Sequence, residues 1–314
     1  MRKRLGTALV AALLACGSAH SQEETLFSGV CFGPFRAGEE PGVRPPLPST
    51  LRADLRAVQA VAGAVRTYGM SGTGSLVPTL CAELGLRCWP GAWIAKDRAA
   101  NDLECELLVE AARDASAVVD TVLVGNEVLL RGDLGPEALI ERIRDVRRRL
   151  TARIGTAEPW HIWIAHPELV EAVDVIVVHV HPYWDEVPVE NAAAHTLDML
   201  GMVREIAQGK PVVLGEFGWP TGGTPYGGAV PGDANAARYL TEVLPLLREQ
   251  GDPYFVFEMW DEAWKAGQEG AVGPHWGLFH ADGGPKPKLV EALPGLDAGT
   301  VERPPRPVTP ERRR

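Results

Sequence analysis

Short apolar runs alternate with amphipathic segments along most of the chain. The apolar runs are rich in Val, Ile and Leu, which is typical of parallel strands buried on both faces, and the segments between them repeat Ala, Leu and charged residues at helical spacing. The predicted strands cover residues 26–32, 64–68, 87–94, 118–126, 154–157, 173–179, 211–216 and 254–260. The predicted helices cover residues 50–62, 75–84, 101–115, 136–150, 167–172, 192–207 and 233–248, with a short one after Lys288.

This alternation predicts the fold class. Eight β/α units in a row indicate an α/β protein with a single (β/α)8 TIM barrel, which we expect to cover residues 24–297. A doubly wound sheet is disfavoured because the chain lacks its glycine-rich phosphate turn. Residues 298–314 are rich in Pro and Arg and are predicted to be a disordered tail.

The N-terminus predicts export. Basic residues 2–4 precede an apolar stretch over residues 5–15 and then small residues, which is the pattern of a secretory signal peptide over residues 1–21. The sequence Leu-Leu-Ala-Cys ending at Cys16 also resembles a bacterial lipobox, so a lipid anchor at Cys16 is the alternative. In both cases the mature protein is periplasmic or extracellular, and the apolar run is too short to span a bilayer.

Four cysteines follow this segment, at positions 31, 81, 88 and 105. In an oxidising compartment an even number permits a disulfide, and the region from Cys81 to Cys105 is the place for one. Buried free thiols are the alternative, because a domain of this size does not need cross-links. The spacing of Cys81 and Cys88 is not that of a zinc site.

Composition narrows the ligand class. The net charge of −10 argues against nucleic acid or an anionic membrane surface as a partner. The chain has nine Trp among its 314 residues, and tryptophan can stack on the apolar face of a sugar ring as well as fill a core. We expect a monomer that binds a neutral carbohydrate.

Two of the predicted strands end at a glutamate, Glu127 and Glu216. The two lie 89 residues apart, about three βαβ units of roughly 30 residues each, so they should end strands 4 and 7 of the barrel. Strands three apart in an eight-stranded barrel face each other across its mouth, where catalytic groups of this fold are placed. A pair of carboxylates is the minimum apparatus for breaking a glycosidic bond.

At this point the chain resembles a known family. GNE at residues 125–127 and GEFGWP at residues 215–220 are similar to motifs of glycoside hydrolase family 17, the β-1,3-glucanase family of (β/α)8 glycosidases. The likeness extends, in the family's order, through GVCFGPF (29–35), RTYG (66–69), VHPYW (180–184), DEAWK (261–265) and HWGLF (275–279). It therefore spans nearly the whole mature chain.

The resemblance implies a retaining glycosidase acting on β-glucan, with β-1,3 linkages the first expectation. Glu127 matches the family's acid/base and Glu216 its nucleophile, and no metal or cofactor is implied. Retention predicts a carboxyl separation of about 5–5.5 Å, against about 6.5–9.5 Å for inversion. A β-glucan transglycosylase would use the same two glutamates, so the sequence leaves hydrolysis and transfer, as well as endo and exo action, open.

Further site residues follow by position. Asn126 resembles the residue that binds the sugar 2-hydroxyl, Tyr183 is a candidate for orienting the nucleophile, and Glu262 with Lys265 matches a charged pair that would tune the acid. An ordinary surface ion pair is the alternative for the last two. The strand ends add Trp219 and Trp260 as a stacking floor, Arg66 and Tyr68 as walls on the non-reducing side, and Glu158 as a ligand for a hydroxyl.

Two departures and two competing interpretations remain. Cys31 stands where many relatives have Asn, and Gly273 where many have Glu.

His179 and His181 share one face of a strand, as metal ligands of some barrel hydrolases do, but no later set of Lys, His and Asp ligands accompanies them. A non-catalytic carbohydrate-binding barrel is the alternative from another class, and it predicts the loss of one carboxylate.

Overall fold

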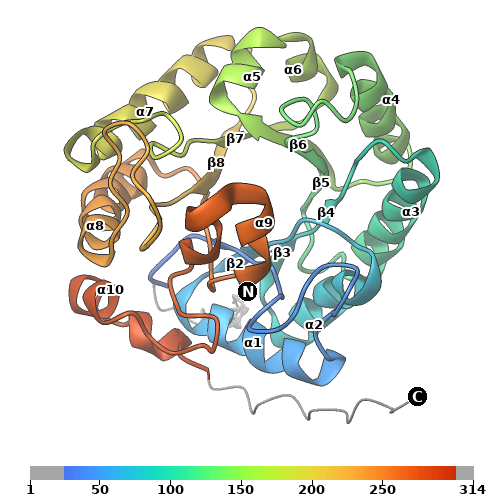
Figure 1. Cartoon of the computed structure of the whole chain (residues 1–314). Coiled ribbons are helices and arrows are strands. Elements are labelled where there is room, and N and C mark those ends of the chain that lie inside the picture. The colour runs from blue at the N-terminus through green and yellow to red at the C-terminus, as the bar shows by residue number, and fades with distance from the viewer. Residues whose placement is uncertain (1–24, 302–314) are drawn as a thin grey trace, which may run out of the picture.

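A computed structural model describes residues 25–301 as a closed parallel barrel inside a ring of helices (Figure 1). The strands are all parallel and pair in the order β3-β2-β1-β9-β8-β7-β6-β5-β4. Their bounds are β1 Val30–Cys31, β2 Ala64–Arg66, β3 Arg87–Trp89, β4 Gly91–Ala92, β5 Thr121–Asn126, β6 Arg153–Pro159, β7 Val175–His179, β8 Val212–Phe217 and β9 Tyr254–Val256. The predicted TIM barrel is confirmed.

One predicted strand is split in two. The run over residues 87–94 forms β3 and β4 because Pro90 between them has no amide hydrogen for the ladder. The carbonyl oxygen of Pro90 accepts a hydrogen bond of 2.9 Å from the amide of Leu123 in β5, so the two ends of the strand order belong to one continuous segment and the barrel closes. Counted around the barrel, β5 is therefore the fourth strand and β8 the seventh.

The helices form the outer ring seen in Figure 1. Each predicted helix is present with shifted ends. Helices α5 and α9 are additional, because six and four residues are too few to show a helical period. The bounds are α1 Pro48–Val61, α2 Val77–Leu84, α3 Arg98–Asp114, α4 Pro136–Arg147, α5 Trp160–Ala165, α6 Glu168–Ala172, α7 Val189–Ile206, α8 Asp233–Gln250, α9 Ala266–Glu269 and α10 Pro287–Ala292. Short 3-10 turns lie at Gly72–Leu76, Ala263–Lys265, Gly270–His275 and Leu296–Gly299.

The apolar strands are buried on both faces, as their composition predicted. Every residue of β7 and of β8 is buried, with one face toward the barrel interior and the other toward the helices. Helix α3 begins at Asp97, whose carboxylate accepts a hydrogen bond of 3.1 Å from the amide of Ala100. Burial of this kind holds the strand ends rigidly, which is what a site built on them requires.

The start of the predicted tail is ordered. Residues 298–301 lie in or beside the 3-10 turn Leu296–Gly299, and the carbonyl oxygen of Val301 accepts a hydrogen bond of 3.0 Å from Arg36. The prediction of a disordered tail from residue 298 is thus wrong for its first four residues, because a buried arginine binds the backbone there. The rest of the tail, the signal peptide over residues 1–21 and the lipid anchor at Cys16 lie outside the described residues.

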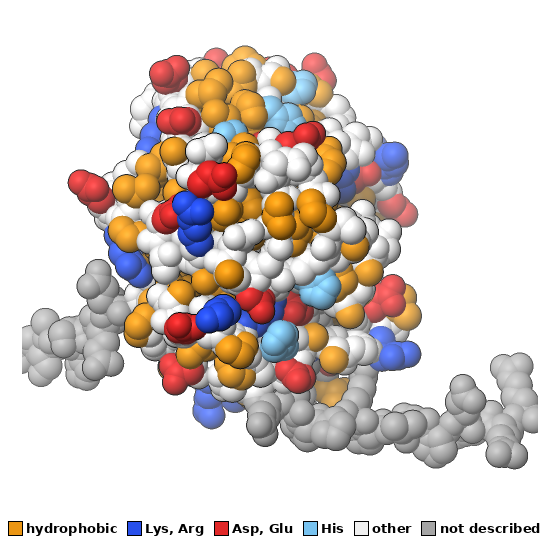
Figure 2. All heavy atoms as spheres, turned by 60° about the vertical axis from the view of Figure 1, so that its left-hand side comes forward, with side chains coloured by type: hydrophobic (Ala, Val, Ile, Leu, Met, Phe, Trp, Pro, Cys, Tyr) orange, Lys and Arg blue, Asp and Glu red, His pale blue; other side chains and the backbone are white. Residues whose placement is uncertain are grey.

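The surface and the cysteines add little that is specific. Over residues 25–301 no helix combines the length and the apolar character needed to cross a bilayer. Figure 2 shows acidic and basic side chains interspersed on the face that it presents, rather than gathered by sign. Cys31, Cys81, Cys88 and Cys105 are buried and carry free thiols.

Candidate active site

The two predicted glutamates lie at the carboxyl ends of facing strands. Glu127 directly follows β5, and Glu216 is the fifth residue of β8. The backbone bends sharply before Glu127, with a φ of 93° at Gly125 and 53° at Glu127. A Cβ at position 125 would lie 2.6 Å from a methyl carbon of Val128, so this bend requires glycine. A strained backbone conformation of this kind often occurs at functional sites, which agrees with Glu127 as a site residue.

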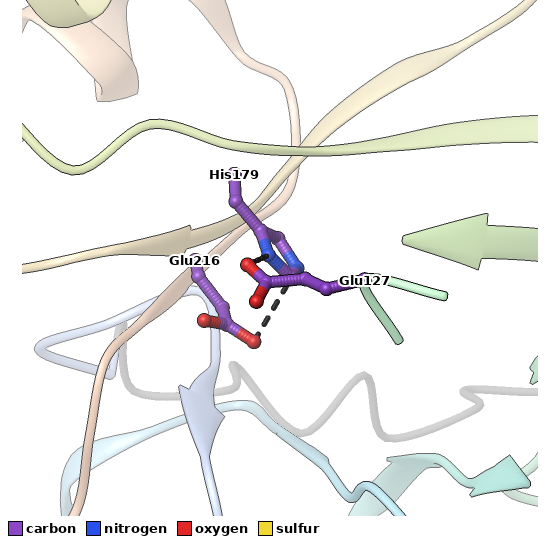
Figure 3. Close-up of side chains that lie close together, drawn as sticks. All are labelled: Glu127, His179 and Glu216. Atoms are coloured by element: carbon purple, nitrogen blue, oxygen red, sulfur yellow. Dashed lines mark hydrogen bonds and ion pairs between the residues drawn. The ribbon is translucent and has the colours of Figure 1, made fainter. Parts of the chain in front are cut away.

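His179, the last residue of β7, lies between the two carboxylates (Figure 3). Its Nδ1 atom is 2.8 Å from Oε1 of Glu127, and its Nε2 atom is 3.3 Å from Oε1 of Glu216. One oxygen of Glu127, one nitrogen of His179 and one oxygen of Glu216 all lie within 4.8 Å of one another. The two glutamates therefore converge on the same small volume.

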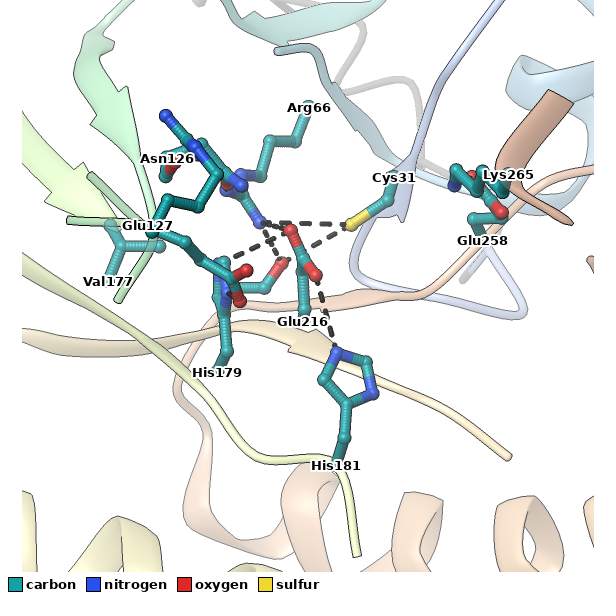
Figure 4. A network of polar contacts seen from close by, with 12 residues as sticks. Cys31, Arg66, Asn126, Glu127, Val177, His179, His181, Glu216, Glu258 and Lys265 are labelled. Carbon is teal, nitrogen blue, oxygen red and sulfur yellow. Dashed lines mark hydrogen bonds and ion pairs between the residues drawn. The ribbon is translucent and has the colours of Figure 1, made fainter. Parts of the chain in front are cut away.

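Glu216 is held as an anion. Arg66 donates a hydrogen bond of 2.9 Å from Nη1 to Oε1 of Glu216, and Nε2 of His181 lies 3.3 Å from Oε2 (Figure 4). Burial alone would raise the pKa of Glu216, but the charges of His179 and Arg66 and the hydrogen bond from His181 lower it well below its usual value. An ionised carboxylate is the state that a nucleophile needs.

Glu127 occupies a different environment. Its side chain is 25% exposed, whereas that of Glu216 is 6% exposed. Within residues 25–301 the one side chain that hydrogen-bonds its carboxylate is His179, and no Lys or Arg contacts it as Arg66 contacts Glu216. Two carboxylates with such unequal surroundings suit the unequal roles of acid and nucleophile.

The same three side chains could in principle ligate a metal ion. However, Arg66 places a full positive charge 2.9 Å from the Glu216 carboxylate, and His179 already forms a hydrogen bond with Glu127 through Nδ1. A cation at this point would be repelled by the guanidinium and would have to replace that hydrogen bond. The donor set fits a hydrogen-bonded acid pair better than a metal centre.

Arg66 and Asn126 belong to the same network. The second guanidinium nitrogen of Arg66 donates to the side-chain oxygen of Asn126, and Nη1 also donates to the backbone oxygen of Gly215 at 2.7 Å. Arg66 thus links three strand ends instead of forming only a wall. Tyr68 lies beneath it, with the guanidinium 5.1 Å from the ring centre.

Tyr183 does not contact Glu216. Its hydroxyl donates to the backbone oxygen of Thr224 at 2.8 Å, and His181, two residues earlier, contacts Glu216 instead. The prediction for Tyr183 is corrected here because the chain turns away from the barrel axis after His181, which carries the tyrosine ring to the rim.

Glu262 and Lys265 are buried and do not form a surface ion pair. Nζ of Lys265 lies 2.9 Å from Oε2 of Glu262 and also donates to Oε2 of Glu258, which follows β9. Burial raises the pKa of Glu258 well above its usual value, although Lys265 opposes this. Figure 4 shows Lys265 and Glu258 beyond Cys31, on the side of Glu216 that is remote from Glu127.

The two tryptophans predicted to form a stacking floor are core residues. Trp219 is 2% exposed and donates from its indole nitrogen to the backbone oxygen of Val230, and Trp260 is 1% exposed beneath Arg36. This corrects the prediction, because a sugar can stack only on an accessible indole face. An accessible tryptophan near the site is Trp184, which is 41% exposed.

Trp184 belongs to a cluster that we call the aromatic rim, made of Tyr183, Trp184, Tyr226 and Trp276. Ring centres in this cluster are 4.8 to 6.1 Å apart. Trp276 also lies 5.1 Å from the ring of His181, so the aromatic rim continues directly from the contact partner of Glu216.

Glu158 has a structural role. Its carboxylate accepts hydrogen bonds from the amides of Leu129 at 2.8 Å and Leu130 at 3.3 Å, so it holds the loop after Glu127 and has no free oxygen directed at a sugar. Burial raises the pKa of Glu158 to about 7. Its predicted role as a ligand for a hydroxyl is therefore corrected.

Sequence reasoning missed the two imidazole contacts and Glu258. The pattern His179-x-His181 does signal two side chains on one face of a strand, but the sequence suggests only metal ligation for the pair and, for His181, a place in the VHPYW motif. No motif in the sequence marked Glu258, because an acid four residues before Glu262 could equally be an ordinary charged residue at the rim of the barrel.

Comparisons with known proteins agree with this geometry. A family model described as the BtgE/BtgC glycoside hydrolase domain matches residues 29–277. A glucan 1,3-beta-glucosidase of Arthroderma benhamiae is 31% identical over 255 residues, which cover 74% of this chain and 82% of that protein. A glycoside hydrolase family 17 beta-1,3-glucanosyltransferase from Rhizomucor miehei superimposes with a TM-score of 0.75 at 26% identity, over 84% of this chain and 97% of that one. An endo-laminarinase from Formosa shares the fold, with a TM-score of 0.76 at 20% identity over 88% of this chain and 90% of its own.

Proposed function

The chain belongs to the BtgE/BtgC glycoside hydrolase domain family, within glycoside hydrolase family 17, and on that premise we propose that it is a retaining glycosidase of β-1,3-linked glucan. Glu216 is the nucleophile and Glu127 the acid/base. The glucan follows from similarity to relatives named as glucan 1,3-beta-glucosidases and to a solved transferase with bound laminaritriose.

The observation that supports this most directly is the approach of the two carboxylates. Oxygens of Glu127 and Glu216 lie within 4.8 Å of each other, which fits the short separation of retaining enzymes and is too close for the water that an inverting enzyme needs. The unequal surroundings of the two acids favour an ionised Glu216 and a proton held near Glu127.

The reaction has two displacements. In the first, Glu216 forms a bond to the anomeric carbon while the bond from that carbon to the leaving oxygen breaks, and Glu127 gives its proton to that oxygen. In the second, an acceptor oxygen bonds to the anomeric carbon, the bond to Glu216 breaks, and the acceptor proton passes to Glu127. The β configuration is kept because two inversions occur.

Incubation with laminari-oligosaccharides followed by NMR of the first products tests the proposal. We expect cleavage with β-anomers formed first. Initial α-anomers would exclude retention, and no cleavage of any β-glucan would exclude the enzyme. Because a non-catalytic binding barrel would bind the same sugars, Glu127→Gln and Glu216→Gln proteins should still bind laminaritriose while losing turnover.

Transfer to a sugar is the second candidate, and the aromatic rim favours it. Trp184 and Tyr226 are 41% and 44% exposed, and Trp276 lies between Trp184 and His181, the contact partner of Glu216. The two exposed rings can stack on an acceptor sugar that competes with water. Product lengths decide: oligosaccharides longer than the donor indicate transfer, and only shorter ones indicate hydrolysis.

We also propose that the protein is an exported monomer. The basic and apolar pattern of residues 1–21 supports export, and Cys16 supports a lipid anchor as one form of it. Mass spectrometry of the mature N-terminus separates an unmodified chain that begins after the signal from a diacylglyceryl-modified Cys16, and size-exclusion chromatography measures the oligomeric state.

A further inference from the structure

The motif His179-x-His181 has a role that the reaction scheme does not include. Alternate residues of a strand point to the same side, and here each imidazole contacts a different carboxylate of the pair. His179 contacts Glu127 through Nδ1 at 2.8 Å, and His181 contacts Glu216 through Nε2 at 3.3 Å (Figure 4). His179 additionally lies 3.3 Å from Glu216 through Nε2, so it touches both acids.

The hydrogen-bonding chemistry of His179 fixes where protons can lie. Its Nε2 atom is buried 3.3 Å from the ionised Glu216 and forms no hydrogen bond within residues 25–301, and the negative charge beside it favours an N–H there over a bare lone pair. A neutral ring with its hydrogen on Nε2 leaves Nδ1 as an acceptor, so the 2.8 Å contact with Glu127 then requires a proton on the Glu127 carboxyl. A protonated ring that donates to an ionised Glu127 contains the same number of protons.

We propose that Glu127 and His179 share a single proton, and that this pair, not Glu127 alone, is the acid of the reaction. The proton that moves to the leaving oxygen comes from the pair, and the acceptor hydroxyl returns one to the pair. His179 is a positioning residue, since it acts through Glu127 and does not meet the sugar. This inference rests on the proposed glycosidase function.

The surroundings of His179 support a shared proton over a permanent imidazolium. The negative charge of Glu216 stabilises a protonated imidazole at His179, whereas the positive charge of Arg66, 2.9 Å from Glu216, destabilises it. On the other neighbouring strand, β6, Glu158 turns its carboxylate to the amides of Leu129 and Leu130. The titratable and charged groups facing His179 are thus Glu127 from the end of β5, Glu216 from β8, Arg66 from β2, Glu158 from β6 and His181 from its own strand.

The consequence is a specific pH profile. Loss of the acid form requires removal of a proton that either Glu127 or His179 can hold, and a coupled pair holds its last proton to higher pH than a lone glutamate. Without the imidazole, one group fewer can hold the proton, so the alkaline limb of the pH profile should lie at lower pH.

Two matched variants test this. His179→Asn should move the alkaline limb of kcat/KM on laminari-oligosaccharides to lower pH by about one to two units, whereas His181→Asn should lower kcat by about tenfold at every pH and leave that limb in place. An alkaline limb that stays where it is in His179→Asn, or that moves in His181→Asn alone, overturns the proposal. If the wild-type protein cleaves no β-glucan, the proposed function is contradicted. If the wild type is active but the two variants do not behave as stated, only the shared-proton proposal is contradicted.

A second measurement does not depend on activity or on the folding of His179→Asn. Nitrogen-15 NMR of the histidine rings, in the wild-type protein and in Glu127→Gln, follows the protonation of His179 directly. We expect the midpoint of His179 to change in Glu127→Gln, because the amide cannot hold the shared proton. The same His179 titration in both proteins would overturn the inference.

Discussion

The guanidinium of Arg66 lies 2.9 Å from the carboxylate of Glu216, and both side chains are buried. The same guanidinium binds the backbone oxygen of Gly215 and the side chain of Asn126, so it connects the ends of three strands across the mouth of the barrel. This contact stabilises the anionic form of Glu216 in the folded protein.

Replacing Arg66 with Met should destabilise the protein by about 3–5 kcal/mol, because Glu216 would become a buried charge without the guanidinium that hydrogen-bonds to it. In a Glu216→Gln background the same replacement should cost clearly less, since no charge is left to compensate. Urea denaturation of the four proteins gives both values. Equal costs in the two backgrounds would show that Arg66 acts through packing alone.

The roles of the two glutamates should separate on substrates that need no acid. Glu127→Ala should hydrolyse natural oligosaccharides about 100- to 10,000-fold more slowly, but it should still release a good leaving group such as dinitrophenolate. Added azide should then accelerate turnover of that substrate and yield a β-glycosyl azide. Glu216→Ala should fail on both substrates without azide. With azide it should yield the α-glycosyl azide, because azide attacks from the α side at the empty nucleophile position. Glu127→Ala should not give this α-product.

Glu158 should make stability depend on pH. Burial raises its pKa to about 7 in the folded protein, whereas an unfolded chain has a value near 4.3, so the folded state binds more protons between these values. Its contribution is therefore full below about pH 4.3 and is lost as the pH rises through about 7, at roughly 1.4 kcal/mol per unit of pKa shift.

Glu158→Gln should accordingly show a flatter free energy of unfolding between pH 5 and 8 than the wild-type protein, measured by urea denaturation. Glu171→Gln, on α6, is the matched control because the side chain of Glu171 is exposed. Parallel curves for wild type and Glu158→Gln would contradict the assigned burial.

Trp184→Ala should lower the share of products longer than the donor, because it removes an exposed face of the aromatic rim on which an acceptor sugar can stack. Trp93→Ala is the matched control, since Trp93 is 40% exposed but lies beneath Arg131, outside the aromatic rim. Chromatography of laminaripentaose products gives the ratio of transfer to hydrolysis. If that ratio falls more in Trp93→Ala than in Trp184→Ala, the aromatic rim is not the acceptor site.

The buried thiols should be inert in the folded protein. Burial raises the pKa of Cys31 to about 12 and that of Cys105 to about 11, so few thiolates exist at pH 8. Iodoacetamide at pH 8 should therefore leave Cys31, Cys81, Cys88 and Cys105 unlabelled until guanidinium is added, after which peptide mapping should find all four labelled. Labelling of only two after unfolding would reveal a disulfide in the exported protein.

The sequence by itself determined the barrel, the order of its units and the positions of both glutamates. Strand and helix periods are local properties of the chain, and a closed ring of eight β/α units places residues three units apart on facing strands whatever their side chains are. Glu127 and Glu216 could be found in this way because each stands at the end of an apolar run.

Only the tertiary structure decided which side chains those glutamates meet. His181 and Tyr183 are two residues apart, yet a turn of the chain brings one to Glu216 and the other to Thr224. Trp219 and Trp184 are both near strand ends, but one is enclosed by the barrel and the other faces solvent. Such contacts depend on strand register and loop conformation across segments distant in sequence, and no local period encodes them.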